Sequence, residues 1–223
     1  MSQFTIRLYK DSDYHVVRSL FAVNIMEHVN RAFRHALQLP HIYLPLLCLL
    51  LLPVLSTTLI TASICALALI IVCLWLGAQY TFRSSVQNAF SDDLLDIQKY
   101  YLERENHCFW VLEMSGKVVG TVAAIPSSSP GGKNHLEIKR LSVSKSHRRK
   151  GIAKALVRAT VDFARMRGCT AVIALTTSAQ VDALRLYEKL GFRLMNAFHR
   201  PMPFRKLLDL KSMFYQYDIP QNQ

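Results

Sequence analysis

A long uncharged segment constrains this chain more than any other feature of its sequence. No charged residue occurs from Ile42 to Phe82, and the most apolar part runs from Ile42 to Ala78. One membrane-spanning helix needs about 20 apolar residues, so this part is too long for one straight helix and suits two short ones. Pro53 and residues 56–58 near its middle favour a break. The alternative, a helix buried in a soluble core, rarely exceeds about 25 residues.

The flanks of this segment predict how the chain is placed relative to a membrane. Residues 4–9 alternate like a strand, and the residues after them have the apolar spacing of a helix. Such a pair normally joins the sheet of its domain, here built by residues 108–218. Both flanks would then lie on one side of the membrane, which requires an even number of crossings. Arginines on both flanks agree with this, whereas one crossing with residues 1–41 on the far side is the competing topology.

The remaining sequence predicts a mixed α/β (α+β) sheet domain. Residues 83–104 have the spacing of an amphipathic helix, and a Ser115-Gly116 turn joins two strand-like runs into a hairpin. The other expected elements are strands over residues 136–143, 170–175 and 213–219 and helices over residues 152–166 and 179–190. We therefore divide the chain into N-terminal strand and helices (1–41), a membrane hairpin (42–82) and the main domain (83–223).

A basic run with one glycine separates a predicted strand from a predicted helix. The run is Arg148-Arg149-Lys150-Gly151-Ile152-Ala153. Glycine lets the backbone approach a ligand closely, and the start of a helix offers unpaired N–H groups and the positive end of its dipole. These features together form an anion site. The run therefore predicts a site for a phosphorylated ligand.

Charge and cysteine content narrow the possible partners. The formal net charge is +12, and nearly all of the surplus falls in residues 135–223. Nucleic acid, an anionic membrane or a polyanionic cofactor would each explain it, but no aromatic residues interleave the basic run as nucleic-acid binding would favour. The five cysteines fit neither a disulfide framework nor a zinc spacing. We expect a cytosol-facing domain without a metal and without nucleic acid as a partner.

Two successive motifs of this sequence resemble those of the GCN5-related N-acetyltransferase superfamily. The basic run fits that family's acetyl-CoA signature, Gln/Arg-x-x-Gly-x-Gly/Ala, and a second block follows one strand later as Leu186-Tyr187-Glu188-Lys189-Leu190-Gly191-Phe192. Further motifs resemble the N-acetyltransferase 8 (camello-like) family: Met26-Glu27-His28, Ala32-Phe33-Arg34, the apolar insert, Asp96-Ile97 with Tyr100-Tyr101, Cys108-Phe109-Trp110-Val111 and Gly151-Ile152-Ala153-Lys154-Ala155-Leu156.

This resemblance implies a membrane-bound N-acetyltransferase, mainly of the endoplasmic reticulum, with acetyl-CoA as its donor. The implied fold is that of the superfamily with an inserted transmembrane helical hairpin. The acceptor would be a small amino-acid-type amine such as a cysteine S-conjugate, with protein lysines and L-aspartate as alternatives within the family. A membrane-attached, acetyl-CoA-binding interaction module without turnover is the non-enzymatic alternative.

The resemblance also implies roles for individual residues. The pyrophosphate of acetyl-CoA would lie on the backbone N–H groups of residues 148–153, and the pantetheine arm would run beside Leu141, Ser142 and Val143. A backbone N–H of these three residues would polarise the thioester carbonyl. Tyr187 matches the tyrosine that protonates the departing thiolate; its alternative is a core aromatic.

Glu137 is the candidate general base, because a glutamate at the matching position takes the amine proton through water in some superfamily members. Its alternative is an ion pair with Lys139 on the same face of the strand. His135 and His147 are weaker candidates, because histidine is a common proton-transfer residue. Lys139 or Arg140 would suit an acceptor carboxylate.

The sequence departs from the superfamily pattern at two positions. Gln180 replaces a usual asparagine, and Ala153 leaves less room than glycine.

Overall fold

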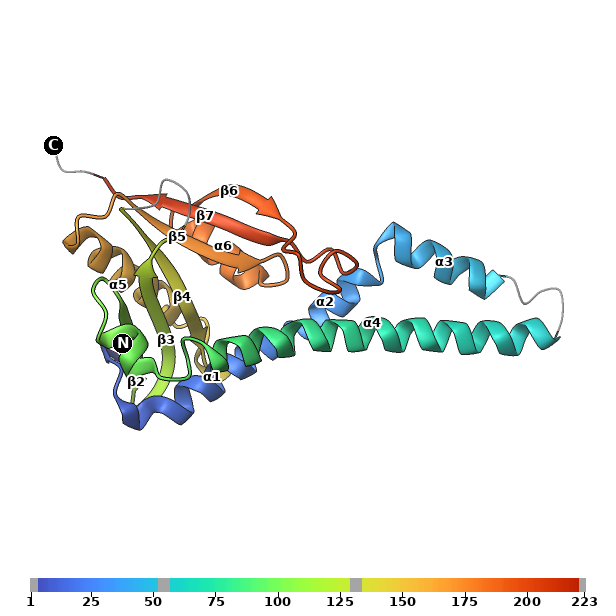
Figure 1. Cartoon of the computed structure of the whole chain (residues 1–223), viewed down its shortest axis with the longest axis horizontal. Helices are drawn as coiled ribbons and strands as arrows, with labels where there is room; N and C mark the ends of the chain where they lie inside the picture. The colour runs from blue at the N-terminus through green and yellow to red at the C-terminus, as the bar shows by residue number, and fades with distance from the viewer. Residues whose placement is uncertain (1–3, 52–56, 129–133, 221–223) are drawn as a thin grey trace.

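The computed structural model describes residues 4–51, 57–128 and 134–220. Within these residues, seven strands form one mixed sheet in the order β1-β2-β3-β4-β5-β7-β6 (Figure 1). Strands β4 and β5 run parallel, and the other neighbours run antiparallel. The strands are β1 (Phe4–Leu8), β2 (Cys108–Met114), β3 (Lys117–Pro126), β4 (His135–Val143), β5 (Ala171–Thr177), β6 (Arg193–Phe198) and β7 (Ser212–Asp218).

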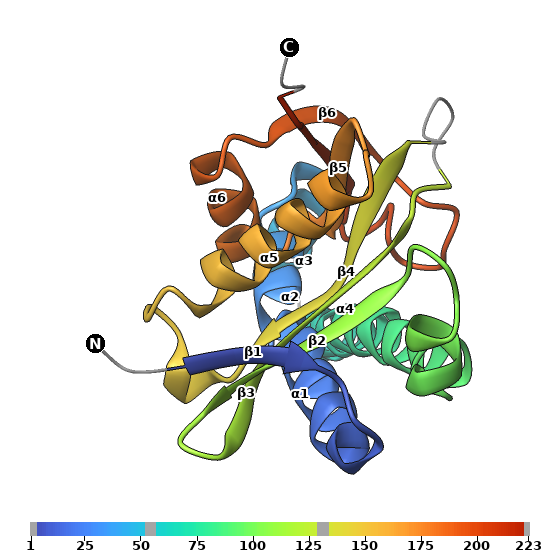
Figure 2. The same ribbon diagram turned by 90° about the vertical axis from the view of Figure 1, so that its left-hand side faces the viewer.

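Helices cover both faces of the sheet (Figure 2). On one face α5 (Ile152–Met166) and α6 (Val181–Lys189) pack over a core that includes Leu112 and Val122. On the other face α1 (Tyr14–Met26) and the end of α4 (Thr57–Ser91) pack over Val111 and Ala123. Neighbouring residues of β2 and β3 thus enter opposite cores, as the alternating side chains of a strand require.

The structure confirms the mixed sheet domain and most of the elements expected from the sequence. The Ser115-Gly116 hairpin is present, with φ angles of 50° and 73° at these two residues. One strand was not expected: β6 (Arg193–Phe198), whose six residues are all exposed. A strand at the sheet edge that buries no face gives no alternating apolar pattern, which explains why the sequence does not reveal it.

The helix expected over residues 83–104 is wrong in its extent. Its first part continues α4 without a break as far as Ser91, and the rest is a turn followed by a π-helix over Gln98–Leu102. The apolar residues of that stretch still face the core, because Leu94, Ile97 and Tyr101 are almost fully buried. The helical period therefore identified the buried side chains but not the break between the helices.

The apolar segment forms helices that project beyond the sheet domain. In Figure 1, α3 (Pro40–Leu51) lies beside α4. The apolar part of α4 has a mean hydropathy of 2.7 with 11% of that stretch buried, so length and composition allow it to cross a membrane. Of the expected break, Pro53 and Ser56 lie outside the described residues. Since α4 begins at Thr57 and ends at Ser91, one helix connects the apolar segment directly to the sheet domain.

Candidate active site

The site lies where the two parallel strands separate. Strands β4 and β5 pair from His135 with Ala171 to Ile138 with Ala174, and both continue beyond that point. A cavity of about 570 Å³ opens there. Its walls come from β4, β5, α6, the side of α4 and the segment that joins β6 to β7. The strands thus leave an open space where their pairing ends.

Strand β4 is irregular beside this cavity. Between Lys139 and Ser142 it has one more residue than the paired stretch of β3, and Arg140 has a φ of 55°. The hydroxyl of Thr121 donates to the carbonyl oxygen of Arg140 at 2.9 Å. A bulge of this kind leaves an extra backbone unit outside the ladder of hydrogen bonds. The bulge therefore brings the backbone at Leu141, which lines the cavity, partly out of the ladder between β3 and β4.

A buried ion pair holds this irregular stretch. The Nε of Arg140 donates to the Oδ2 of Asp93 at 2.7 Å, and Tyr101 donates its hydroxyl to the same carboxylate. Asp93 has no exposed surface, and the Arg140 guanidinium lies over the ring of Phe21. The hypothesis that Arg140 binds an acceptor carboxylate therefore needs correction, because Asp93 already neutralises this charge. Lys139 also lines the cavity and has no such partner in the described chain.

Glu137 faces the cavity without a close cation. No ion pair within 4.0 Å joins it to Lys139 or to any other described residue. Burial raises the pKa of its carboxyl, and the positive charges of Lys139, Arg200 and Arg140 oppose that rise. A carboxylate with a raised pKa accepts a proton more readily than a solvated one, which is the property that a general base requires.

Tyr187 lines the same cavity from α6. Its side chain is buried, with ring centroids 5.2 Å from Phe192 and 6.0 Å from Tyr215. Burial alone raises the pKa of its phenol, so the group keeps its proton at neutral pH. The hydroxyl has no hydrogen-bond partner within the described ranges. Tyr187 thus belongs to the core and also reaches the cavity that contains Glu137.

The basic run forms the connection between β4 and α5. Gly151 has a φ of 79°, no side chain caps the helix, and a Cβ at this position would meet nothing within 4 Å. The first N–H groups of α5, from Ile152 and Ala153, therefore have neither an intrahelical partner nor a side-chain cap. The exposed cations Arg149 and Lys150 flank them. These features fit a bound phosphate group.

Arg148 differs from its two basic neighbours. Its Nη1 lies 2.8 Å from the Oε2 of Glu27, and its Nη2 donates to the Oδ1 of Asn24 at 2.9 Å. Its Nε donates to the carbonyl oxygen of Val143 at 3.3 Å. Arg148 therefore connects the start of the loop to the end of α1, and Arg149 and Lys150 carry the free charge.

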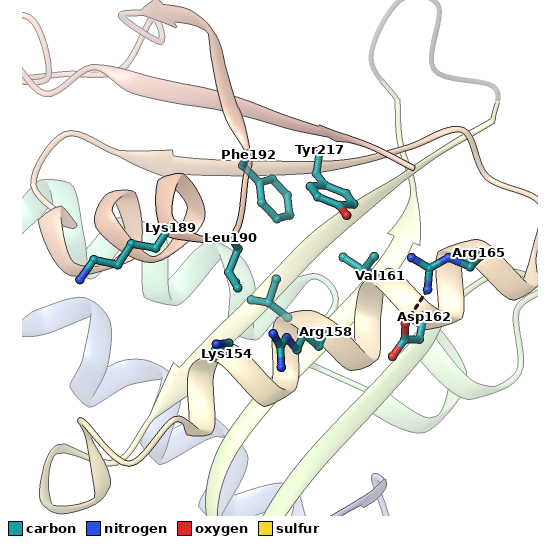
Figure 3. Close-up of a pocket in the computed structure, with 10 residues that line it drawn as sticks. Lys154, Arg158, Val161, Asp162, Arg165, Lys189, Leu190, Phe192 and Tyr217 are labelled. Atoms are coloured by element: carbon teal, nitrogen blue, oxygen red, sulfur yellow. Dashed lines mark hydrogen bonds and ion pairs between the residues drawn. The ribbon is translucent and has the colours of Figure 1, made fainter. Parts of the chain in front are cut away.

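A second cavity of about 350 Å³ lies between α5 and the end of α6 (Figure 3). Lys154 and Arg158 of α5 and Lys189 of α6 line it, and Phe192 and Tyr217 form its apolar wall. Arg165 at its far end is paired with Asp162 at 2.8 Å. Lys154 and Arg158 continue the basic run of residues 149–150 along α5, and Lys189 lines the cavity from α6.

The structure separates several other candidates from the cavity. Ser142 and Val143 are buried in β4 and do not line it, and neither His135 nor His147 does. Gln180, by contrast, lines the cavity, but its Oε1 accepts the hydroxyl of Thr176 and the N–H of Thr177, so this oxygen holds the turn before α6. No group of three or more possible metal ligands occurs in the part of the chain that the structure describes.

Two residues at the site carry no signal in the sequence. Asp93 meets Arg140 only through the fold, and Arg205 enters the cavity from the segment between β6 and β7. Neither residue belongs to a motif, although Asp93 lies three residues before Asp96, and no local spacing distinguishes them from surface charges.

Comparison with known families decides what this arrangement is. A model of the acetyltransferase (GNAT) family matches residues 73–192, more than half of the chain. The chain belongs to the GNAT family. The splayed strands, the glycine of the basic run and the tyrosine of the second block all fall within the matched residues. It is therefore an acetyl-CoA-dependent N-acetyltransferase.

Curated relatives place the chain in the N-acetyltransferase 8 (camello) branch of that family. It is 39% identical to N-acetyltransferase family 8 member 3 of Mus musculus over 86% of each chain. It is 37% identical to N-acetyltransferase 8 of Rattus norvegicus over 100% of each chain. A probable N-acetyltransferase camello of Xenopus tropicalis is 33% identical over 98% of this chain and 99% of its own.

Solved structures show the same fold. A GNAT-family acetyltransferase of Staphylococcus aureus superposes with a TM-score of 0.60 at 16% identity, covering 98% of this chain and 100% of its own. A putative acetyltransferase of Salmonella typhimurium, solved with its cofactor acetyl-CoA, superposes with a TM-score of 0.54 at 15% identity, covering 100% and 97%.

Proposed function

We propose that this enzyme is membrane-bound and acetylates the amine of a small amino-acid-type acceptor such as a cysteine S-conjugate. The observation that carries the proposal is the single cavity that Glu137, Lys139 and Tyr187 share at the separation of β4 and β5. It offers a base, a cation and an acid on the walls of one cavity. That combination suits an acceptor that carries both an amine and a carboxylate.

The donor would be held by the basic run and the neighbouring helix. The N–H groups of residues 149–153 would bind the pyrophosphate, with Arg149 and Lys150 as counter-charges. Lys154, Arg158 and Lys189 suit the phosphate on the ribose of acetyl-CoA, because the described residues offer them no carboxylate partner. Leu141 lies where the bulge of β4 would present a backbone N–H to the thioester oxygen.

The cavity residues would then move two protons. Glu137 would take a proton from the acceptor ammonium, directly or through one water, and leave a neutral amine. The amine nitrogen forms the new C–N bond as the C–S bond of the thioester breaks. Burial raises the pKa of the Tyr187 phenol, so the group is protonated when the thiolate forms. Tyr187 would give its proton to the departing thiolate and regain one from the acylated nitrogen, which carries one proton too many after the C–N bond forms.

The membrane would lie beside the acceptor cavity. Helix α4 contributes Thr81 and Phe82 to its wall, and a Cβ at Gly77 would stand 2.8 Å from the Phe204 ring, so the segment between β6 and β7 packs closely on this helix. We place residues 42–82 in the membrane as a hairpin, with residues 1–41 and 83–223 together on the cytosolic side of the endoplasmic reticulum. Apolar S-substituents would reach the cavity from that surface.

Acceptor screening tests this function. Purified full-length enzyme in detergent is mixed with acetyl-CoA and separate pools of S-substituted cysteines, free amino acids including L-aspartate, and lysine peptides, and products are identified by mass spectrometry. N-acetylated cysteine conjugates are expected. Acetylated lysine peptides without acetylated free amino acids would instead establish a protein acetyltransferase. Acetyl-CoA binding without any product would favour the non-enzymatic module.

A further inference from the structure

Arg205 is a buried cation in the wall of the acceptor cavity. The residue is 6% exposed and lies in the segment that joins β6 to β7. The Nε donates to the carbonyl oxygen of Leu210 at 3.3 Å, and the Nη2 donates to the Oγ of Ser212 at 3.2 Å. Within the described residues the Nη1 has no acceptor, and no carboxylate lies within ion-pair distance of the guanidinium.

The other buried charges in the described chain are neutralised. Asp13 pairs with Arg7 at 2.7 Å, and Asp93 pairs with Arg140. Arg205 alone among these buried charged residues faces neutral partners. An arginine cannot lose its proton to escape this cost, because its pKa stays too high. Burial and the nearby charge of Arg200 nevertheless lower the pKa of this guanidinium, which means that its surroundings disfavour the cation.

The cavity as a whole carries a surplus of positive charge. Lys139, Arg200 and Arg205 line it with no described anionic partner, whereas Arg140 is balanced by Asp93 outside the cavity. Glu137 is the carboxylate that faces these cations. A ligand with a negative charge would therefore remove a surplus that the protein itself leaves uncompensated.

We infer that Arg205 binds the α-carboxylate of the acceptor and so selects free amino acids over residues within a protein chain. The inference rests on the proposed function and names the group that recognises its substrate. The planar guanidinium matches a carboxylate, with Nη1 as a free donor. The hydroxyl of Ser212 accepts from Arg205, so its own hydrogen is free to donate to the same carboxylate. A lysine inside a protein has no carboxylate to place there.

The test compares S-benzyl-L-cysteine with S-benzyl-L-cysteinamide, which differ only in the carboxylate. Acetylation kinetics are measured for the wild-type enzyme, Arg205→Gln and Arg205→Lys. Lys206→Gln is the matched control, since this exposed cation lies next in sequence and does not line the cavity. Acetyl-CoA binding and thermal unfolding are recorded for every variant.

Loss of a charge-assisted hydrogen bond predicts a clear result. The wild type should prefer the acid over the amide on the order of 100-fold in kcat/KM. Arg205→Gln should remove this preference by raising KM for the acid while amide turnover remains; Arg205→Lys should keep part of it, and Lys206→Gln all of it. Equal use of acid and amide by the wild type would overturn the inference and leave the proposed function intact. If Arg205→Gln lowered kcat/KM equally for the acid and the amide, Arg205 would have only a structural role and the inference would be overturned. Acetylation of lysine peptides alone would overturn the proposed function together with the inference.

Discussion

The ion pair between Asp93 and Arg140 gives the most quantitative prediction. It joins the turn after α4 to the bulge of β4, two segments that no other described ion pair connects. Asp93 is fully buried, and the Arg140 side chain is 17% exposed. Asp93→Asn keeps the shape of the side chain but leaves the guanidinium buried without its counter-charge.

The expected cost follows from this burial. Breaking a buried pair by removing one partner costs about 3 to 5 kcal/mol, and the amide of asparagine can still accept one hydrogen bond, so we expect about 3 kcal/mol. For a chain of this size each kcal/mol lowers the melting temperature by about 2 to 4 °C. Asp93→Asn should therefore lower it by about 6 to 12 °C. Because the pair also holds the bulge beside Leu141, acetyl transfer should fall as well.

Thermal unfolding in detergent, followed by tryptophan fluorescence, measures this effect. Asp162→Asn is the control, since the Asp162–Arg165 pair has a similar N–O distance, 2.8 Å, but side chains that are 63% and 50% exposed. Such a pair contributes about 0 to 1 kcal/mol. A double variant, Asp93→Asn with Arg140→Met, should lose less than the single variant, because no buried charge remains. A single variant that melts no earlier than Asp162→Asn would refute the reasoning.

Three further predictions concern the base, the cofactor loop and the topology. Because burial raises the pKa of Glu137, kcat/KM should fall on the acid side at a higher pH than a solvated glutamate would give, and Glu137→Gln should abolish this limb; an unchanged pH profile would exclude the base. Gly151→Ala places an alanine at a left-handed φ, which costs about 1 to 2 kcal/mol, and should weaken acetyl-CoA binding about 5- to 30-fold. Gly116→Ala, with a φ of 73° in a distant turn, is the control and should leave this binding unchanged. Equal affinities of the two variants for acetyl-CoA in calorimetry would contradict the role of the loop. Tags at the two termini should show the same protease accessibility in sealed microsomes, and protection of one terminus alone would contradict the hairpin.

Sequence patterns predicted those parts of the structure that depend only on neighbouring residues. A glycine between a strand and a helix needs no distant partner to form an anion site, so Gly151 and the start of α5 were accessible from the sequence. The same holds for the Ser115-Gly116 hairpin, whose two positive φ angles belong to the turn itself. The roles of Tyr187 and Glu137 came from resemblance to a family and remain predictions.

Contacts between distant segments could not be predicted in this way. Arg140 follows Lys139 directly in the sequence, but its ion-pair partner, Asp93, lies 47 residues away. Arg148 belongs to the signature, yet Glu27 and Asn24 hold it through a contact that only the packing of α1 on the sheet creates. The packing of tertiary structure, and not any local preference, decides which of several neighbouring cations stays free.

The central claim is that this enzyme transfers acetyl groups with Tyr187 as the proton donor to the thiolate. Tyr187→Phe removes the hydroxyl and keeps the ring that packs on Phe192 and Tyr215. The most direct measurement is kcat for acetylation of S-benzyl-L-cysteine by this variant, alongside its dissociation constant for acetyl-CoA. We predict that kcat falls by about 10²- to 10⁴-fold, the usual contribution of a general acid, while acetyl-CoA binding changes little. An unchanged kcat would contradict the account.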